Sequence, residues 1–253
     1  MWPPRRSARP AAAFFEPTVP PGLRIFAVGD VHGRLDLLEK LLDLIAQDLH
    51  AKPPLEATIV FLGDYIDRGP DSAGVVSLLA QGELPAPAVA LRGNHEAVLL
   101  QFLEDPEILR EWRHWGGLET LASYGVDARV ALRDRTFEPA REALWRALPR
   151  EHLAFYLETR LSFESGDYFF CHAGVRPGLP LHRQDEHDLL WIRDDFNTFE
   201  GPHEKVIVHG HTPVEAPLDL PNRIAVDTGA YASGVLSCVA LEDNDRRFLS
   251  ARA

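Results

Sequence analysis

Five short stretches of the sequence place aspartate, histidine or asparagine beside glycine, and each follows an apolar run. They read GDVHG (29–33), GDYIDRG (63–69), RGNHE (92–96), CHAG (171–174) and HGHT (209–212). Carboxylate, imidazole and amide groups together suit divalent metals of intermediate hardness, such as Mn²⁺, iron or Zn²⁺. A lone histidine after a strand is more often structural, so each stretch alone is a weak signal. Their repetition along one chain predicts a shared metal site.

The elements that would position these residues follow a regular order. The apolar runs RIFAVGD, ATIVFLGD and PAVALRGN read as buried strands, and each precedes a segment with apolar residues at helical spacing. Such βαβ units predict an α/β fold with a largely parallel sheet whose ligands lie at the carboxyl ends of the strands. Further strands are predicted around 159–174, 205–210, 222–229, 234–243 and 246–250.

The domain organisation predicted from the sequence is simple. Residues 1–22 hold six of the chain's 20 prolines and predict a flexible tail. Residues 23–253 predict a single domain, because no internal repeat or linker interrupts them. Within it, residues 105–158 are rich in Trp, Arg, Glu and Leu and predict a helical insertion.

The composition excludes several classes of protein. A net charge of −12 argues against a nucleic-acid surface, because phosphate backbones attract basic faces. No apolar run approaches the ~18 residues of a membrane helix. Cys171 and Cys238 lie in apolar contexts without metal-ligand spacing, so we expect buried, reduced thiols and a cytoplasmic protein.

Taken as a set and in this order, the stretches resemble the calcineurin-like metallophosphoesterases. GD-x-HG, GD-x-x-DRG and GNHE are similar to the motifs of the phosphoprotein phosphatase branch, and GGLETLASYG (116–125) looks like its bacterial members. The resemblance covers roughly residues 24–240. It implies a β-sandwich of two mixed sheets flanked by helices.

The resemblance also implies a set of metal ligands. Two divalent ions are expected, Mn²⁺ first, with iron or Zn²⁺ as alternatives. Asp64 would bridge both ions, since two dications about 3.5–4 Å apart need shared negative charge. The first ion would also bind Asp30 and His32, and the second would bind Asn94, His172 and His211.

The two histidines of HGHT are not equivalent in this reading. The family ligand is the histidine directly after glycine, which here is His211. Pro213 stands where broader metallophosphoesterases often carry a further histidine, which the phosphatase branch also lacks. His209 is interpreted as packing or an outer contact, with direct metal ligation as the alternative.

The implied catalytic groups come from the same stretches. His95 would be the general acid that protonates the leaving oxygen, and Asp67 would orient its ring. Arg68, Arg92 and Arg193 would hold phosphate oxygens, because a guanidinium offers two parallel donors. The alternative for each arginine is a surface ion pair, and for His95 a hydrogen bond to backbone.

The resemblance therefore implies a phosphomonoester hydrolase, first of all a serine/threonine protein phosphatase that could extend to phosphotyrosine. Its partners would be a phosphorylated protein or a small phosphoester, with no nucleic acid and no membrane. A symmetrical dinucleoside tetraphosphate hydrolase of the same superfamily is the nearest alternative. A non-catalytic scaffold is the alternative of another class, but such a protein should have lost ligands, and none is missing.

Overall fold

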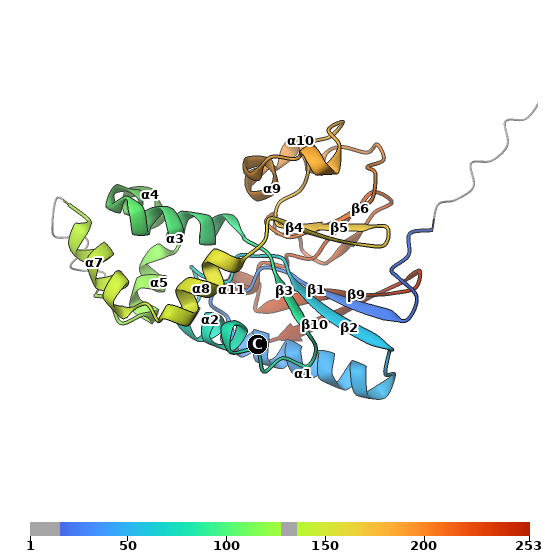
Figure 1. Ribbon diagram of the computed structural model, residues 1–253, viewed down its shortest axis with the longest axis horizontal. Coiled ribbons are helices and arrows are strands. Elements are labelled where there is room, and N and C mark those ends of the chain that lie inside the picture. The colour runs from blue at the N-terminus through green and yellow to red at the C-terminus, as the bar shows by residue number, and fades with distance from the viewer. Residues whose placement is uncertain (1–15, 128–135) are drawn as a thin grey trace, which may run out of the picture.

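A computed structural model describes residues 16–127 and 136–253 (Figure 1). Most of the predicted tail, residues 1–15, and residues 128–135 of the predicted insertion therefore lie outside the described residues. Near the end of the predicted tail, Val19 is buried and its amide donates a hydrogen bond to the Asp243 carbonyl. This segment is thereby attached to the hairpin at the other end of the chain.

The first sheet has five strands in the order β10-β9-β1-β2-β3. Its parallel part follows the predicted βαβ units and consists of β1 (Leu23–Val28), β2 (Glu56–Phe61) and β3 (Ala88–Ala90). β9 (Val235–Glu242) pairs antiparallel with β1, and β10 (Asp245–Arg252) pairs antiparallel with β9. The C-terminal hairpin thus makes the sheet mixed.

The second sheet also has five strands, in the order β4-β5-β6-β8-β7. Its members are β4 (Ser162–Ser165), β5 (Tyr168–Cys171), β6 (Val206–His209), β7 (Leu218–Asp219) and β8 (Arg223–Ala225). β5, β6 and β8 run parallel, whereas β4 and β7 are antiparallel edge strands. The expected pair of mixed sheets is confirmed, and β7 is a strand that the sequence analysis missed.

Side-chain alternation explains why the two sheets pack face to face. In β1, Ile25 and Ala27 belong to the core between the sheets, whereas Phe26 and Val28 belong to the core under the helices. In β5, Tyr168 and Phe170 likewise point into the intersheet core. Successive side chains of a strand point to opposite faces, so a strand buried on both faces is apolar throughout.

Helices cover the outer faces of both sheets. α1 (Leu35–Ala51) and α2 (Ser72–Gln81) pack on the first sheet, α1 through leucines and Ile45 on one face. α9 (Glu186–Trp191) and α10 (Asp194–Asn197) lie over the second sheet, after a 3₁₀ turn at Leu181–Arg183 (Figure 1). The short α11 (Ala230–Ser233) precedes β9.

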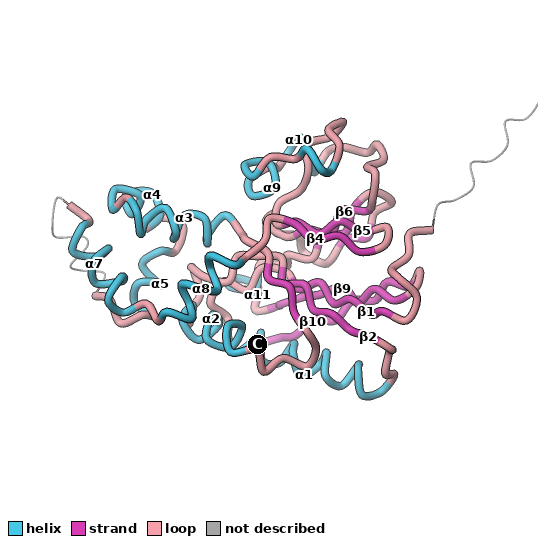
Figure 2. Tube along the Cα trace, in the orientation of Figure 1, coloured by secondary structure: helices cyan, strands magenta, loops and turns pink. Residues whose placement is uncertain are grey.

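The remaining helices gather on one side of the sheets, which Figure 2 shows as the region of helix and loop away from the strands. They are α3 (Asn94–Glu104), a 3₁₀ turn at Pro106–Ile108, α4 (Leu109–Trp112), α5 (Gly117–Ser123), α7 (Glu138–Ala147) and α8 (Arg150–Glu158). No helix within residues 16–127 and 136–253 is both long and apolar enough to cross a membrane. Cys171 and Cys238 are buried free thiols, as expected.

Candidate metal centre

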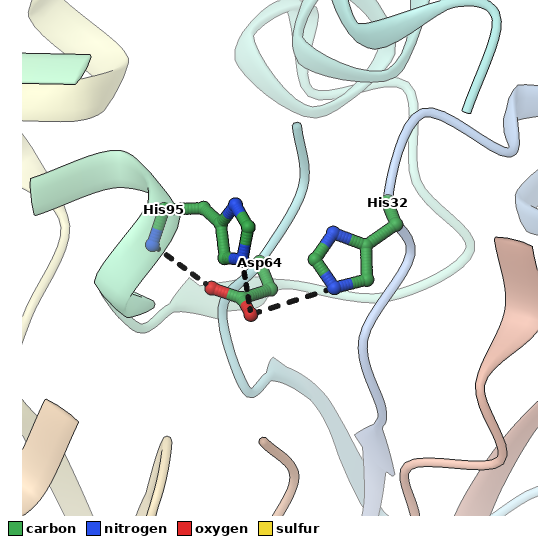
Figure 3. A group of neighbouring side chains, drawn as sticks. All are labelled: His32, Asp64 and His95. Carbon is green, nitrogen blue, oxygen red and sulfur yellow. Dashed lines mark hydrogen bonds and ion pairs between the residues drawn. The ribbon is translucent and has the colours of Figure 1, made fainter. Parts of the chain in front are cut away.

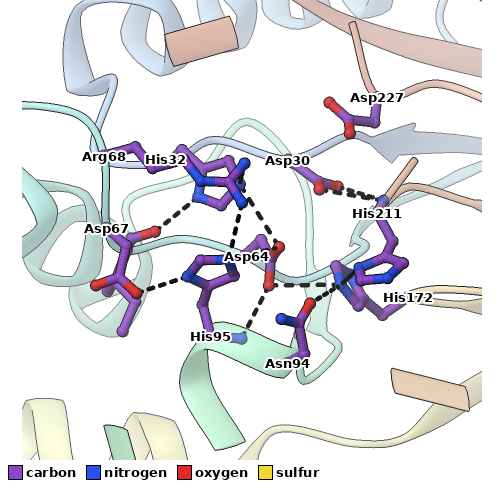
Figure 4. A network of polar contacts seen from close by, with 12 residues as sticks. Asp30, His32, Asp64, Asp67, Arg68, Asn94, His95, His172, His211 and Asp227 are labelled. Atoms are coloured by element: carbon purple, nitrogen blue, oxygen red, sulfur yellow. Dashed lines mark hydrogen bonds and ion pairs between the residues drawn. The ribbon is translucent and has the colours of Figure 1, made fainter. Parts of the chain in front are cut away.

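The loops that follow β1, β2, β3, β5 and β6 meet at one place (Figure 4). Two groups of buried side chains there have ligand atoms within 4.8 Å of one another: His32, Asp64 and His95 form one, and Asp64, His172 and His211 form the other. Asp64 is common to both groups. Parallel strands bring their carboxyl ends to one edge, which explains why residues so distant in sequence meet.

In the first group, His32 is oriented as a metal ligand would be (Figure 3). Its Nδ1 lies 2.8 Å from the Ile66 carbonyl oxygen, so Nδ1 carries the proton and donates it. Nε2 then presents a lone pair 3.5 Å from an oxygen of Asp64. Burial lowers the pKa of His32 to about 3, which keeps the ring neutral. Metal-binding histidines ordinarily donate their second N–H to a carbonyl or carboxylate in this way.

The second group contains contacts that a divalent ion would make favourable. His172 donates Nδ1–H to the Leu62 carbonyl at 2.9 Å, which leaves Nε2 unprotonated. That Nε2 lies 2.9 Å from the Asn94 amide oxygen and 3.1 Å from Nδ1 of His211. Nε2 of His211 is buried without any hydrogen-bond partner. Because buried acceptors that face one another are costly, this donor set fits a divalent ion.

Carboxylates add to the case for bound cations. Both oxygens of Asp30 accept the His211 amide hydrogen, at 3.2 and 3.1 Å. Burial, together with the negative charges of Asp227 and Asp64, raises the pKa of Asp30 well above its usual value. Burial likewise raises the pKa of Asp227 to about 6. Metal ions would offset this repulsion.

Asp30 lies beside the two groups and belongs to neither, so its ligation of the first metal stays a prediction. Asp227, which the sequence analysis did not single out, accepts the Gly229 amide hydrogen at 2.8 Å and lies near Asp30 (Figure 4). The signal that could have found it is the Asp-Thr-Gly that ends the predicted strand at 222–229, since Gly-Asp ends the earlier strands similarly.

His95 and Asp67 form the pair that the sequence analysis predicted. Nδ1 of His95 is 2.6 Å from a carboxylate oxygen of Asp67, and both side chains are buried. Burial lowers the pKa of His95, but the charge of Asp64 and the hydrogen bond to Asp67 outweigh it, so the pKa is raised. Nε2 of His95, the ring nitrogen that is not bonded to Asp67, lies 3.8 Å from a carboxylate oxygen of Asp64 and so faces the metal groups.

Two residues of the helical region hold Asp67 in place. Trp112 of α4 donates its indole N–H to one carboxylate oxygen at 2.6 Å, and Thr120 of α5 donates its hydroxyl to the other at 2.5 Å. Sequence reasoning missed both residues, because they lie in no motif with Asp67. The closest signal was the 116–125 stretch, which contains Thr120.

The buried carboxylate of Glu96 holds the backbone of the loops that follow β2 and β3. Its carboxylate accepts the amide hydrogens of Asp64 at 2.9 Å, Tyr65 at 2.8 Å and Gly93 at 2.8 Å, and the side chain is buried. The last residue of RGNHE thus connects the loop after β2 to the start of α3. Its role is to fix backbone, which the motif alone did not reveal.

The backbone of the site is unusual. Six non-glycine residues in the described part of the chain have positive φ, and five are site residues: His32 (46°), Asp64 (52°), Asp67 (72°), Arg68 (67°) and His211 (63°). L-residues rarely adopt this left-handed region, and such residues cluster at functional sites where the surroundings enforce them.

The three predicted phosphate-binding arginines differ in where their side chains lie. Arg68 reaches Nε2 of His32 at 3.1 Å and Nε2 of His95 at 3.3 Å. Arg193 is exposed, and its positive charge adds to burial in lowering the pKa of both His172 and His211.

Arg92 instead points to the end of α8. It donates Nε–H to the Thr159 hydroxyl at 3.0 Å and lies 3.8 Å from a carboxylate oxygen of Glu186. This resembles the ion-pair alternative more than the phosphate-binding one.

His209 lies outside both ligand groups. Its ring packs edge-on against Phe196, with centroids 4.9 Å apart, and Nδ1 donates to the Gly210 carbonyl at 3.1 Å. Its neighbour in the motif, His211, faces His172 instead. Metal ligation by His211 and not by His209 stays a prediction.

Comparisons with known proteins agree with this geometry. The calcineurin-like phosphoesterase family model matches residues 23–240. The chain is 29% identical to serine/threonine-protein phosphatase 1 of Salmonella typhimurium, over 86% of this chain and 92% of that one. It is 26% identical to bis(5'-nucleosyl)-tetraphosphatase PrpE of Oceanobacillus iheyensis, over 88% and 90% of the two chains. That enzyme is described as asymmetrical, whereas the alternative considered from the sequence was a symmetrical one.

A solved structure described provisionally as a diadenosine tetraphosphatase shares the fold, with a TM-score of 0.62 and 20% identity over 94% of this chain and 99% of that one. At this identity the likeness concerns the fold alone. The family match, in contrast, spans the loops that build the site. The chain therefore belongs to the calcineurin-like phosphoesterase family and is a metallophosphoesterase.

Proposed function

We propose that this metallophosphoesterase is a dinuclear phosphomonoester hydrolase that acts on phosphoserine and phosphothreonine in proteins, and on phosphotyrosine as well. The observation that carries the proposal is the His95–Asp67 pair, whose histidine belongs to the first ligand group. A general acid matters most for a leaving oxygen that departs poorly, such as the alkoxide of serine or threonine.

The proposed metals would be held by residues already described. His32 and Asp64, with Asp30, would bind one ion, and Asp64 with His172 and His211, joined by Asn94, would bind the other. Bound divalent ions supply Lewis acidity and lower the pKa of water for attack on phosphorus. We propose Mn²⁺ as the metal, with iron or Zn²⁺ as alternatives.

The protein's own groups would do the rest. Arg68 and Arg193 would hold the phosphoryl oxygens and offset their charge, which is the main demand of phosphoryl transfer. The bond between phosphorus and the leaving oxygen breaks while water supplies the new oxygen. The proton on Nε2 of His95 moves to the leaving oxygen, and Asp67 stabilises the charged ring before that transfer.

Dinucleoside tetraphosphate hydrolysis is the second candidate, because relatives with that described activity match at nearly the same identity as the protein phosphatases. Purified protein with added Mn²⁺ should be assayed on a phosphoserine peptide and on diadenosine tetraphosphate. We expect the larger kcat/KM on the peptide. A preference of tenfold or more for the dinucleotide, about 1.4 kcal/mol, would contradict the protein phosphatase proposal.

Metal dependence is tested in the same assay. Chelation should abolish activity and Mn²⁺ should restore it. Asp64→Asn should be among the most damaging single changes, because it weakens the one ligand common to both groups. Full activity in a metal-free preparation would refute the dinuclear mechanism. Such activity would also contradict the alternative that the protein is a non-catalytic scaffold.

A further inference from the structure

A cavity of about 470 Å³ opens beside Arg68. It is bounded by Arg68, Arg113, Trp115 and Tyr231, which come from the loop after β2, the loop between α4 and α5, and α11. Its volume lies within the range of ~300–1,000 Å³ that is usual for small-ligand sites. None of the predicted metal ligands lines it.

Two exposed rings distinguish this cavity. Trp115 is 37% exposed and Tyr231 is 40% exposed, and among the described residues only Trp145 and Phe248 are other Phe, Trp or Tyr side chains as exposed. Scattered apolar residues on a surface need no explanation, but two large rings that line one cavity beside Arg68, a proposed phosphate-binding residue, do. The arrangement offers an incoming aromatic group two partners.

The position of Trp115 is tied to that of Arg68. Gly116 follows Trp115 with φ of 103°, and a Cβ there would collide with the backbone of Arg68. The backbone of Gly116 therefore packs directly on the backbone of Arg68, which places the neighbouring Trp115 beside Arg68. Tyr231 is fixed from the other side, because the Arg68 guanidinium stacks over its ring at 4.7 Å.

His95, the proposed general acid, lies beside the same arginine. Arg68 lies 3.3 Å from Nε2 of His95, the nitrogen that would protonate the leaving oxygen. The rings of His95 and His32 are 4.8 Å apart, and those of His32 and Tyr231 are 5.4 Å apart. A leaving group whose oxygen meets His95 can thus extend along Arg68 and Tyr231 into the cavity.

We propose that this cavity is the subsite for the leaving group, and that Trp115 and Tyr231 make it favour an aryl group, the phenol ring of phosphotyrosine. The inference deepens the proposed function and rests on the role of His95 in it. An aryl ring is joined to phosphorus through one oxygen, so it would lie directly beside Arg68, where Tyr231 stacks. A nucleobase is separated from its phosphates by a ribose and would lie farther away.

The test is the variant Trp115→Ala, with Trp145→Ala as the matched control. Trp145 is also an exposed tryptophan, 55% exposed, but it lies on α7 outside this cavity. Each protein is assayed with Mn²⁺ on phenyl phosphate and 2-glycerophosphate, and on phosphotyrosine and phosphothreonine peptides of one sequence. Comparing each variant with the wild type on the same substrate cancels the intrinsic difference between leaving groups.

We expect Trp115→Ala to lower kcat/KM about 2- to 10-fold on the two aryl substrates, the range that one aromatic contact provides. The alkyl substrates should change less than twofold, Trp115→Phe should restore most of the loss, and Trp145→Ala should change neither class. Equal losses on aryl and alkyl substrates, or no loss, would overturn the proposal.

The same variants separate the subsite from the proposed function. If the wild type cleaves phenyl phosphate but neither peptide, the protein phosphatase proposal fails, and an aryl-selective loss in Trp115→Ala still supports the subsite. If Trp115→Ala selectively impairs hydrolysis of diadenosine tetraphosphate and spares phenyl phosphate, the cavity holds a nucleobase and the aryl subsite is refuted.

Discussion

Replacing His95 by asparagine separates a general acid from a metal ligand. The structure permits both roles, because His95 bonds to Asp67 through Nδ1 and also belongs to the ligand group of His32 and Asp64. Asparagine keeps a polar side chain at the start of α3 but cannot transfer a proton. The backbone amide of residue 95, which donates to Asp64 at 3.2 Å, is retained.

The magnitude depends on the leaving group. General acid catalysis contributes about 10²–10⁴-fold where a proton is required, which is about 3–5 kcal/mol. Serine leaves poorly without a proton, so His95→Asn should lose this range in kcat on a phosphoserine peptide. A nitrophenolate departs almost unaided, so the loss on p-nitrophenyl phosphate should stay below about tenfold.

The assay compares kcat for both substrates and measures metal content by elemental analysis. Two metals per chain with a substrate-dependent loss would support the general-acid role. Equal losses on both substrates would assign His95 to phosphate binding or to shaping the site. Loss of a metal would show that His95 is a ligand, and the general-acid role would be withdrawn.

Three further outcomes are expected. Asp67→Asn removes an interaction that raises the pKa of His95. The alkaline limb of the pH profile of kcat on a phosphoserine peptide should therefore move to lower pH, and an unchanged limb would show that another group titrates. His211→Ala should remove one metal and His209→Ala none, and the reverse result would place the ligand register two residues off. Trp112→Phe removes a donor to a buried carboxylate and should lower the free energy of unfolding by about 1.5–3 kcal/mol in urea titrations; a smaller change would mean that the other donors suffice.

The sequence predicted the part of the site whose residues follow the ends of strands. Asp64, Asn94 and His172 each come directly after an apolar strand, and parallel strands place such residues at one edge whatever the details of packing. Their convergence therefore needed only the order of strands and helices. The face-to-face arrangement of the two sheets came from the family resemblance, since apolar runs alone do not say which sheet a strand joins.

The missing parts depend on tertiary contacts that no local pattern contains. Trp112 and Thr120 reach Asp67 from helices about fifty residues away, and only the packing of those helices fixes the contact. Arg92 has the sequence context of a phosphate ligand, yet the carbonyls and hydroxyl at the end of α8 hold its guanidinium. A long side chain beside a motif has several reachable partners, and spacing does not choose among them.

The left-handed backbone of His32, Asp64, Asp67, Arg68 and His211 has a consequence for engineering this protein. Such conformations cost on the order of 1 kcal/mol each, and their sum approaches the ~5–15 kcal/mol that separates a folded domain from its unfolded chain. Replacing one of them by glycine would relieve the strain but would also increase the freedom of the unfolded chain, and at Asp67 it would leave the donors of Trp112 and Thr120 without their acceptor. Each such change would also remove a side chain of the proposed metal centre or its surroundings, so heat resistance is better sought in other parts of the chain.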